Sequence, residues 1–469
     1  MDKNRRIALI AKIAFLAILL LSLNLRKHTF RMPHFSGDQH HYVGLAFKLD
    51  TKGISGYNLR GIELRKAAKH RYLFFFEPSE EKGWVLRALA QANITYYDQP
   101  FHHIPFVFPV AIMLSHRIFA GSEPYYVVYI PDWVEIVRSN PTSVGLRNIR
   151  IDPAVLGKQF YSVIVPLVSS IILIVLVYLL AKQLYGNELV SLIAMFLMAI
   201  SPVDILSSQK LWADDMTAMF TVLAVLMYIL AVDKNKSILA FIGGISCGLG
   251  AITKQNGAFI VFVIVIWHFI ANADKLLKKE TFFHTVFDKN LILFGIGAVL
   301  SSVYWFAKIT SVYGDPIYRP HPSNIDRAAT IDWFRMVGKR PRYVYLFGIP
   351  YLNPLFALAY ISPFWLWIDK RNLRKTTLLI IWMAVFFYIF QIYLGGAGKE
   401  HRYMLPSYAA FAILGGYVAD QIRIFIDKLI GFRAGTMLLV VALLLSAFWC
   451  IPIGLEELFC NSALILRPF

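Results

Sequence analysis

Four polar stretches of this sequence flank or interrupt long apolar runs, and each carries residues capable of chemistry. The first is Ser36-Gly37-Asp38-Gln39-His40-His41-Tyr42. Asp38 lies 13 residues beyond the apolar run that ends at Leu25, which places its carboxylate close to a membrane surface. A carboxylate there could act as a general base or bind a metal. It could also cap a helix over residues 39–49.

The second stretch runs from Ser201 to Met216 and contains a pair of carboxylates, Asp214 and Asp215, at the start of an apolar run. Carboxylates in the first turn of a helix are stabilised by the helix dipole, so the pair could serve the helix alone. Acidic side chains at the edge of a membrane span are also costly to keep dry, which makes them a hypothesis for a functional site. The sequence leaves both interpretations open.

The third stretch, Ala251-Ile252-Thr253-Lys254-Gln255-Asn256-Gly257, is a polar break between two short apolar runs. A lysine in such a turn is either an anchor that extends toward the membrane surface or a ligand for an anion. Lys254 is therefore a candidate for binding a negatively charged group.

The fourth stretch, residues 395–406, is a glycine-rich turn that delivers Lys399, His401 and Arg402 to the start of another apolar run. Flexible backbone with lysine and arginine suits a phosphate or pyrophosphate group. The alternative is an ordinary loop with interfacial anchors, of which Tyr403 would be typical.

The elements that must position these residues are membrane spans. Of the 469 residues, 57% are hydrophobic and 16% are charged, against roughly 25% charged in soluble domains. This composition excludes a soluble globular protein and a disordered chain, and three cysteines exclude a disulfide scaffold. The net charge is +18, and the sequence contains no clustered basic face interleaved with aromatic residues. We therefore interpret the positive charge as membrane anchoring and expect no nucleic-acid partner.

Apolar runs long enough to cross a hydrocarbon core of roughly 30 Å recur along the chain. We predict eleven spans, near residues 7–25, 160–181, 188–204, 216–232, 237–251, 256–271, 290–309, 346–368, 374–394, 404–420 and 434–453. The basic N-terminus and the long first run favour an uncleaved first span over a signal peptide.

A twelfth run, residues 104–119, is short and contains two prolines. Loops on one side of the downstream spans hold 14 Lys and Arg in 48 residues, and those on the other side hold 11 in 76. The denser set should be cytoplasmic, together with the basic N-terminus. Both placements hold only if residues 104–119 do not cross the membrane. We therefore predict that these residues form a helix on the outer membrane surface. Residues 26–159 then form one large external loop, with further external segments at 205–215, 252–255, 310–345 and 395–403.

The four polar stretches, in this order, resemble the GT-C class of membrane glycosyltransferases. The similarity is greatest to the branch with the protein O-mannosyltransferases and the aminoarabinose transferases of lipid A. The matching segments are residues 37–42, 103–106, 199–202, 214–220, 248–254 and 401–406. The order and spacing of these segments carry the resemblance. It implies an all-α polytopic membrane protein with the GT-C fold, about eleven spans and surface helices in the first external loop.

The resemblance implies transfer of a hexosyl or pentosyl group from a polyprenyl-phosphate-linked donor, with inversion at the anomeric carbon. The acceptor would be a lipid, a glycan or a protein on the external face of the plasma (inner) membrane. Asp38 would be the general base, and Asp214 or Asp215 would orient the acceptor or help to hold a metal. Donor phosphate binding is assigned to Lys210, Lys254, Lys399 and Arg402.

The same resemblance assigns contacts with the acceptor or the sugar to His401, Tyr403 and Tyr42. Members of the family often carry an Asp-Glu pair where this chain has Asp38-Gln39, which weakens a metal site with two adjacent acids. We therefore expect that no cofactor is required, with Mg²⁺ or Mn²⁺ as the alternative.

Residues 1–310 would form the catalytic transmembrane module and residues 311–469 the C-terminal helices, with no soluble domain. A transporter or lipid flippase is the alternative function, because it would also need many spans and charges at their edges. Transporters often have pseudo-symmetric halves, whereas the candidate residues here cluster on one predicted face and no internal repeat is present. The clustering favours an enzyme.

Overall fold

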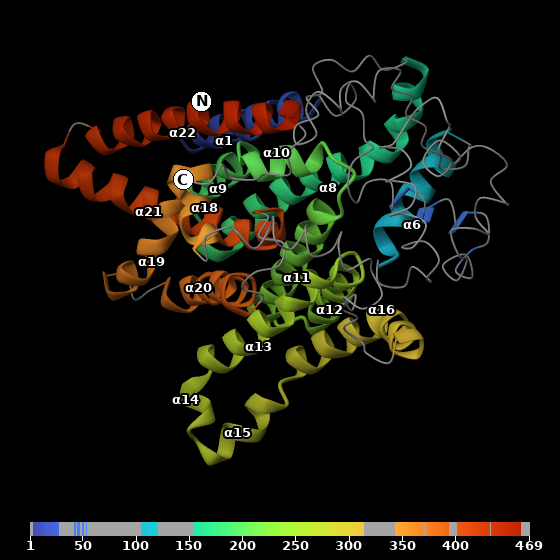
Figure 1. Cartoon of the computed structure of the whole chain (residues 1–469). Helices are drawn as coiled ribbons and strands as arrows, with labels where there is room; N and C mark the ends of the chain where they lie inside the picture. The colour runs from blue at the N-terminus through green and yellow to red at the C-terminus, as the bar shows by residue number, and fades with distance from the viewer. Residues whose placement is uncertain are drawn as a thin grey trace.

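The computed structural model describes residues 3–27, 42–43, 45–46, 49–50, 53, 105–120, 153–313, 343–368, 372–393, 401–431 and 433–460. The regular elements in these ranges are all helices (Figure 1). The α-helices are α1 (Lys3–Arg26), α6 (Val107–Ser115), α8 (Pro153–Tyr185), α9 (Glu188–Ala199), α10 (Pro202–Ser208), α11 (Asp214–Lys234), α12 (Ser237–Ala251), α13 (Ile260–Ala271), α14 (Ala273–Leu276), α15 (Lys279–Val286), α16 (Lys289–Tyr313), α18 (Val344–Leu352), α19 (Ala357–Ile368), α20 (Leu373–Phe387), α21 (Leu405–Ile430) and α22 (Ala434–Cys460). Short 3₁₀ or π turns are η4 (His116–Ala120), η6 (Gln255–Phe259), η7 (Pro354–Phe356), η9 (Tyr388–Tyr393) and η10 (His401–Met404).

The length and apolar character of its helices identify this chain as an integral membrane protein. Seven helical stretches of the described residues are long and apolar enough to cross a membrane, and the bent pair α9 and α10 would make an eighth. α12 and α13 are apolar but shorter. The predicted all-helical membrane fold is confirmed, while the count of eleven spans stays a prediction.

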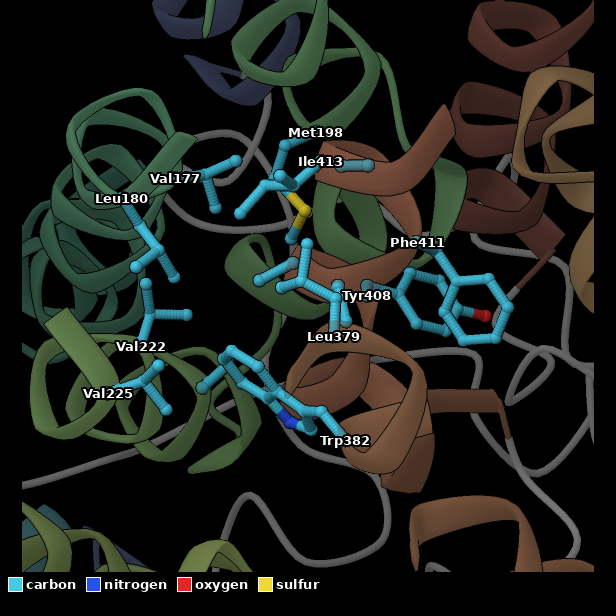
Figure 2. Close-up of a cluster of buried hydrophobic side chains, with 14 of the residues drawn as sticks. Val177, Leu180, Met198, Val222, Val225, Leu379, Trp382, Tyr408, Phe411 and Ile413 are labelled. Carbon is cyan, nitrogen blue, oxygen red and sulfur yellow. The ribbon is translucent and has the colours of Figure 1, made fainter. Parts of the chain in front are cut away.

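The centre of the bundle is a continuous apolar core formed by α8, α9, α11, α20 and α21. Figure 2 shows Leu180, Met198, Val222, Trp382 and Phe411 meeting there from these five helices. Many apolar side chains of α1 and α22 instead point outward, as Phe448 at 80% exposure illustrates. Such outward apolar faces suit contact with lipid.

A break between α9 and α10 brings polar backbone into the bundle. The two helices meet at 58°, and Pro202 occupies the first turn of α10, where its missing N–H needs no partner. All seven residues of α10 are buried. The chain after α10 therefore runs inside the molecule to the first turn of α11, where Asp214 lies.

Helix α6 fulfils the prediction of a helix within residues 104–119. Its first backbone N–H, at Val107, donates to the carbonyl oxygen of Ile252 at 3.2 Å. Phe108 and Ile112 pack in one apolar cluster with Leu211 and Ala213. α6 therefore lies against the turn after α12 and the linker before α11. Its place on the outer membrane surface stays a prediction.

Candidate active site

An ion pair between Asp214 and Lys254 forms the centre of the candidate site. Lys254 Nζ lies 2.6 Å from Asp214 Oδ1. Asp214 is the first residue of α11 and is fully buried, while the Lys254 side chain is 18% exposed. A buried carboxylate requires such a partner, because its desolvation is otherwise costly. The pair joins two of the four stretches that the sequence singled out.

The backbone around Lys254 explains how its side chain reaches Asp214. Lys254 is extended, with φ −155° and ψ 135°, between the end of α12 and η6. The turn closes tightly, because a Cβ at Gly257 would lie 2.5 Å from the carbonyl carbon of Gly250. Glycine is required at this position by the close approach of the two backbones. The turn therefore holds Lys254 at one place.

Arg402 brings a second cation to Asp214 from the C-terminal part of the chain. Its Nη1 lies 3.9 Å from Asp214 Oδ2, and its guanidinium carbon lies 4.2 Å from the centre of the Trp212 ring. A guanidinium over an indole face is favourable through cation–π attraction. Trp212 thus holds Arg402 beside the carboxylate of Asp214, which follows Trp212 by two residues in the chain.

The Tyr403 ring lies close to both cations. The Lys254 ammonium is 4.5 Å from the centre of the Tyr403 ring and the Arg402 guanidinium carbon is 5.2 Å from it. Asn256 Nδ2 donates to the backbone carbonyl of Tyr403 at 3.1 Å. That bond connects the Lys254 turn to η10, so the positions of the two cations depend on each other.

The charge of this cluster determines which ligand it can take. Lys254 and Arg402 carry two positive charges against the single negative charge of Asp214. The remaining positive charge is partly buried, where electrostatic interactions are less screened than at the surface. A compact anion such as a phosphate group would fit this cluster chemically.

The second acid of the pair, Asp215, faces another way. Its carboxyl is fully buried, and the charge of the nearby Asp204 carboxyl acts on it. Asp204 in turn forms an ion pair with Arg26. Successive residues of a helix point about 100° apart. Asp214 therefore contacts the cations, and Asp215 lies near a separate buried pair, Arg26 and Asp204.

The other predicted residues in the described ranges lie buried near this centre. Lys210 is 3% exposed, and burial lowers the pKa of its ammonium to about 8. His401 is buried with its ring 5.4 Å from that of Tyr345. Tyr42 is 7% exposed and packs edge-on against Phe108, in the same cluster as Leu211. Tyr42 therefore belongs to the layer that covers the linker before Asp214.

Two predicted residues, Asp38 and Lys399, lie outside the described residues. Among the described residues, no three His, Cys, Asp or Glu side chains gather in a group that could hold a metal. Asp214 is the described carboxylate at this centre, and its partners are the cations.

Sequence reasoning missed Trp212, Asn256 and Arg26. An aromatic residue two positions before the acid pair could have drawn attention to Trp212 as a partner for a cation. Asn256 adjoins a lysine that was already a candidate. Arg26 ends the first apolar run, and an arginine there normally reaches toward water, so nothing in its local sequence indicated burial.

Comparisons with known proteins match this fold. The family model described as dolichyl-phosphate-mannose-protein mannosyltransferase matches residues 149–301, a range that includes Asp214 and Lys254. An uncharacterized protein of Aquifex aeolicus (strain VF5) is 22% identical over 317 residues, which are 67% of this chain and 58% of that protein.

Two solved membrane transferases share the architecture. The oligosaccharyltransferase of Archaeoglobus fulgidus superposes with a TM-score of 0.53 at 14% identity, over 96% of this chain and 56% of that chain. ArnT of Cupriavidus metallidurans superposes with a TM-score of 0.53 at 12% identity, over 98% of this chain and 77% of that chain. The chain thus spans little more than half the length of the oligosaccharyltransferase.

The fold is therefore that of the GT-C membrane glycosyltransferases, as the order of the sequence motifs indicated. Most of this chain is included in both superpositions. Identity at this level establishes the architecture, and function must be argued from the site.

Proposed function

We propose that this chain is a membrane glycosyltransferase that moves a sugar from a polyprenyl-phosphate donor to an acceptor on the external face. The observation that carries the proposal is the meeting of Asp214, Lys254 and Arg402 at one place. They come from three stretches far apart in sequence, each at an end of an apolar helix. A transferase that works at one membrane surface needs such a cluster, whereas a transporter needs a site reachable from both sides.

The two cations are proposed to bind the donor phosphate. Known proteins of this fold support that ligand class. ArnT has been solved bound to undecaprenyl phosphate, and the Archaeoglobus fulgidus protein AglB has been solved with an inhibitory peptide and a dolichol-phosphate, at a TM-score of 0.50. In this chain the phosphate would contact Lys254 and Arg402, and Asp214 would hold both cations in place. Lys210 and Lys399 are proposed to add to the same positive potential.

The transfer would proceed by displacement at the anomeric carbon. The acceptor oxygen forms a bond to that carbon while its proton passes to the Asp38 carboxylate. The bond from the carbon to the phosphate oxygen breaks, and the polyprenyl phosphate leaves with the electron pair. General base assistance contributes about 10²- to 10⁴-fold. Stabilising the negative charge on the leaving phosphate is the larger electrostatic contribution, and it falls to Lys254 and Arg402.

The acceptor is proposed to approach the site from the side of the first external loop. Tyr42, within that loop, packs against α6 beside the linker to α11. His401 and Tyr403 belong to η10, and the Tyr403 ring centre lies 4.5 Å from the Lys254 ammonium. These three residues are proposed to contact the sugar or the acceptor, because aromatic faces suit stacking against sugar rings. The sugar is a hexose or a pentose.

A divalent cation is not required in this proposal, since Lys254 and Arg402 already supply positive charge at the leaving group. Asp38 and Asp214 are the carboxylates that Mg²⁺ or Mn²⁺ would use, since both metals prefer oxygen ligands. One structure of the Archaeoglobus fulgidus oligosaccharyltransferase contains Zn and sulfate. When bound, such an ion would supply positive charge for the phosphate.

The test is transfer by the purified protein in liposomes that contain labelled polyprenyl-phosphate sugars, beside Asp38→Asn. The wild type should release or transfer the sugar, and the variant should lose about a hundredfold or more, as expected for a general base. Equal turnover by both proteins would remove Asp38 from the mechanism. If neither protein acts on any lipid-linked donor, while a lipid or solute crosses the bilayer in the same liposomes, the protein is a transporter or flippase.

A further inference from the structure

The elbow formed by α14 and α15, residues 273–287, projects from the bundle between α13 and α16 (Figure 1). α13 begins at Ile260, six residues after Lys254, and the elbow follows its other end. The elbow therefore lies at the end of α13 that is opposite to the candidate site, and the mechanism above does not use it.

Buried polar contacts hold one face of α15 against the bundle. His268 of α13 is 5% exposed, and its Nε2 donates to the carbonyl oxygen of Thr285 at 3.0 Å. Its Nδ1 accepts from the Tyr228 hydroxyl of α11 at 3.1 Å. Asn272 Nδ2 donates to the carbonyl oxygen of His268 at 2.8 Å, at the start of the elbow. The Thr285 side of α15 is thus fixed inward.

The other face of α15 carries large apolar side chains that are exposed. Phe283 and Phe287 lie two residues on either side of Thr285, which is about 200° around a helix. They are 68% and 63% exposed, and their rings stack with centres 6.5 Å apart. Leu277, in the turn between α14 and α15, is 88% exposed. A group of such side chains on one short segment indicates a contact surface.

The two helices that flank the elbow present apolar faces that suit contact with lipid. Phe262, Ile266 and Ile270 of α13 are 40% to 55% exposed and lie four residues apart, on one face of the helix. Ile292 and Ile296 of α16 are 42% and 44% exposed with the same spacing. The elbow joins the ends of these two faces, so its apolar side continues a surface that already meets the bilayer.

The length of the chain places α15 at the level of the lipid headgroups. The apolar stretch Lys279–Ser311, which contains α15 and α16, has 33 residues, or about 50 Å at 1.5 Å per residue. A bilayer has a hydrocarbon core of about 30 Å and measures about 40–45 Å with its headgroups. When α16 spans the core, α15 is therefore at the boundary between acyl chains and headgroups.

The charged side chains of the elbow suit the same boundary. The exposed charges are four lysines, Lys275, Lys278, Lys279 and Lys289, and two acids, Asp274 and Glu280. A third acid, Asp288, accepts from the backbone N–H groups of Asn290 and Leu291 and so caps α16. Lysine can lay its apolar stem along a lipid surface while its ammonium stays at the phosphates. The exposed charge of the elbow is positive, as a phospholipid surface requires.

We propose that the elbow is an interfacial anchor that binds the phospholipid leaflet on the side of the membrane opposite to the candidate site. Leu277, Phe283 and Phe287 lie between the headgroups and the acyl chains, and the lysines contact lipid phosphates. The buried bonds of His268 hold α15 in the orientation that turns its rings toward the lipid.

The test uses a fluorescent nitrobenzoxadiazole probe on Leu277→Cys, in the full chain with Cys460→Ser. The remaining cysteines, Cys247 and Cys450, are buried. The protein is reconstituted in nanodiscs of phosphatidylcholine and phosphatidylglycerol. Lipids with a nitroxide high on the acyl chain quench a probe at the boundary, and iodide quenches a probe in water. The probe should be quenched by the lipid nitroxide and protected from iodide.

Two sets of substitutions separate the rings from the lysines. Phe283→Ser with Phe287→Ser should lower the ratio of lipid to iodide quenching about tenfold or more, because each ring loses its burial in lipid. Lys275→Gln, Lys278→Gln and Lys279→Gln together should lower it about fivefold or more, the effect of roughly one lysine at an anionic surface. The lysine variant changes exposed side chains only, so it keeps the test valid if the other variant folds poorly.

A matched control neutralises lysines at the same end of the bundle. Lys234→Gln with Lys236→Gln changes exposed side chains in the turn between α11 and α12, and the ratio at Leu277→Cys should stay at its value before substitution. An equal loss in this control would show a general effect of charge and overturn the role of the elbow lysines.

Three outcomes at the labelled elbow would overturn the proposal. A probe that iodide reaches and the lipid nitroxide does not would make the elbow a solvated loop. Protection from both quenchers would mean that protein, such as a second copy of this chain, covers the apolar face. An unchanged ratio in both substituted proteins would remove the rings and the lysines as anchors. Because these measurements need no sugar transfer, their outcome is independent of the proposed function.

Discussion

At the residue scale, one carboxylate organises the candidate site. The Asp214 carboxylate accepts a hydrogen bond from the Lys254 ammonium at 2.6 Å and lies 3.9 Å from the Arg402 guanidinium. Both cations also rest on aromatic faces, of Tyr403 and Trp212. Such a carboxylate acts on the substrate through the cations it holds. The proposed role of Asp214 is therefore to prepare a phosphate site.

Neutralising Lys254 tests that role. Lys254→Gln should lower transfer from a polyprenyl-phosphate donor by about 10²-fold or more, the range seen when one preorganised electrostatic group is lost. Transfer rates in liposomes measure the effect. Lys182→Gln is the matched control, because Lys182 forms a half-exposed ion pair with Glu188 near the C-terminal end of α8, and ion pairs that water reaches contribute little. Equal rates for Lys254→Gln and wild type would remove Lys254 from the donor site.

A second prediction at this scale concerns pH. His116 is buried beside Ser162, and burial lowers its pKa from 6.5 to about 4, against a smaller opposing effect of Asp50. Below pH 6.5 the unfolded chain binds a proton that the folded chain does not. Stability should thus be constant above pH 6.5 and fall between 6.5 and 4, by at most about 1.4 kcal/mol per pH unit.

Thermal midpoints in detergent across this pH range measure that fall. His116→Gln keeps a polar side chain of similar size and cannot titrate, so its midpoint should decline less steeply than that of the wild type. Parallel slopes in the two proteins would show that other groups control acid stability.

At the element scale, the site depends on helices that are broken or packed unusually closely. The bend between α9 and α10 carries Asp204 and the linker to Asp214 into the bundle. The pair α12 and α16 packs with backbones in contact, because a Cβ at Gly244 would lie 2.0 Å from the carbonyl oxygen of Phe294. The Lys254 turn begins where α12 ends. Displacement of α12 should therefore reach the site.

Gly244→Ala tests the packing of α12 on α16. The added methyl must push two backbones apart, so the free energy of unfolding should fall by about 1–3 kcal/mol, as in other overpacked cores. Gly295→Ala in α16 is the control, since its added Cβ would meet nothing within 4 Å. Alanine favours a helix over glycine by about 1 kcal/mol, so this variant should be as stable as the wild type or more so. A stable Gly244→Ala protein would contradict the close packing.

At the scale of the whole molecule, segments from distant parts of the sequence contact one another around the site. α6 contacts Ile252 and Leu211, and Asn256 contacts Tyr403. The basic elbow of α14 and α15, with Lys275, Lys278 and Lys279, projects from the rest of the molecule (Figure 1). The positive-inside preference predicts that this elbow lies in the cytoplasm.

Single cysteines test that topology. In a background with Cys460→Ser, Lys278→Cys should react with an impermeant maleimide from the cytoplasmic side, and Glu400→Cys from the external side. The two remaining cysteines, Cys247 and Cys450, are buried and should label little. Labelling of both positions from the same side would overturn the predicted arrangement of loops.

Much of the fold could be predicted from apolar length alone. The predicted span 237–251 coincides with α12, and the runs at 160–181 and 434–453 lie within α8 and α22. Single spans follow from composition because every backbone group in lipid must be bonded within its own helix. Broken helices are harder to predict from sequence. The run predicted at 188–204 is divided between α9 and α10, because Pro202 begins a new helix.

Residue types at the edges of spans were enough to select Asp214, Lys254 and Arg402 as candidates, and the order of motifs was enough to indicate the GT-C fold. The tertiary structure decided which of two adjacent acids contacts the cations. It also decided that Arg26 is a buried connector rather than a surface anchor. The physical reason is that the sequence gives spacing along a helix, whereas side chains about 100° apart face different neighbours. Those neighbours are known only when the helices are packed.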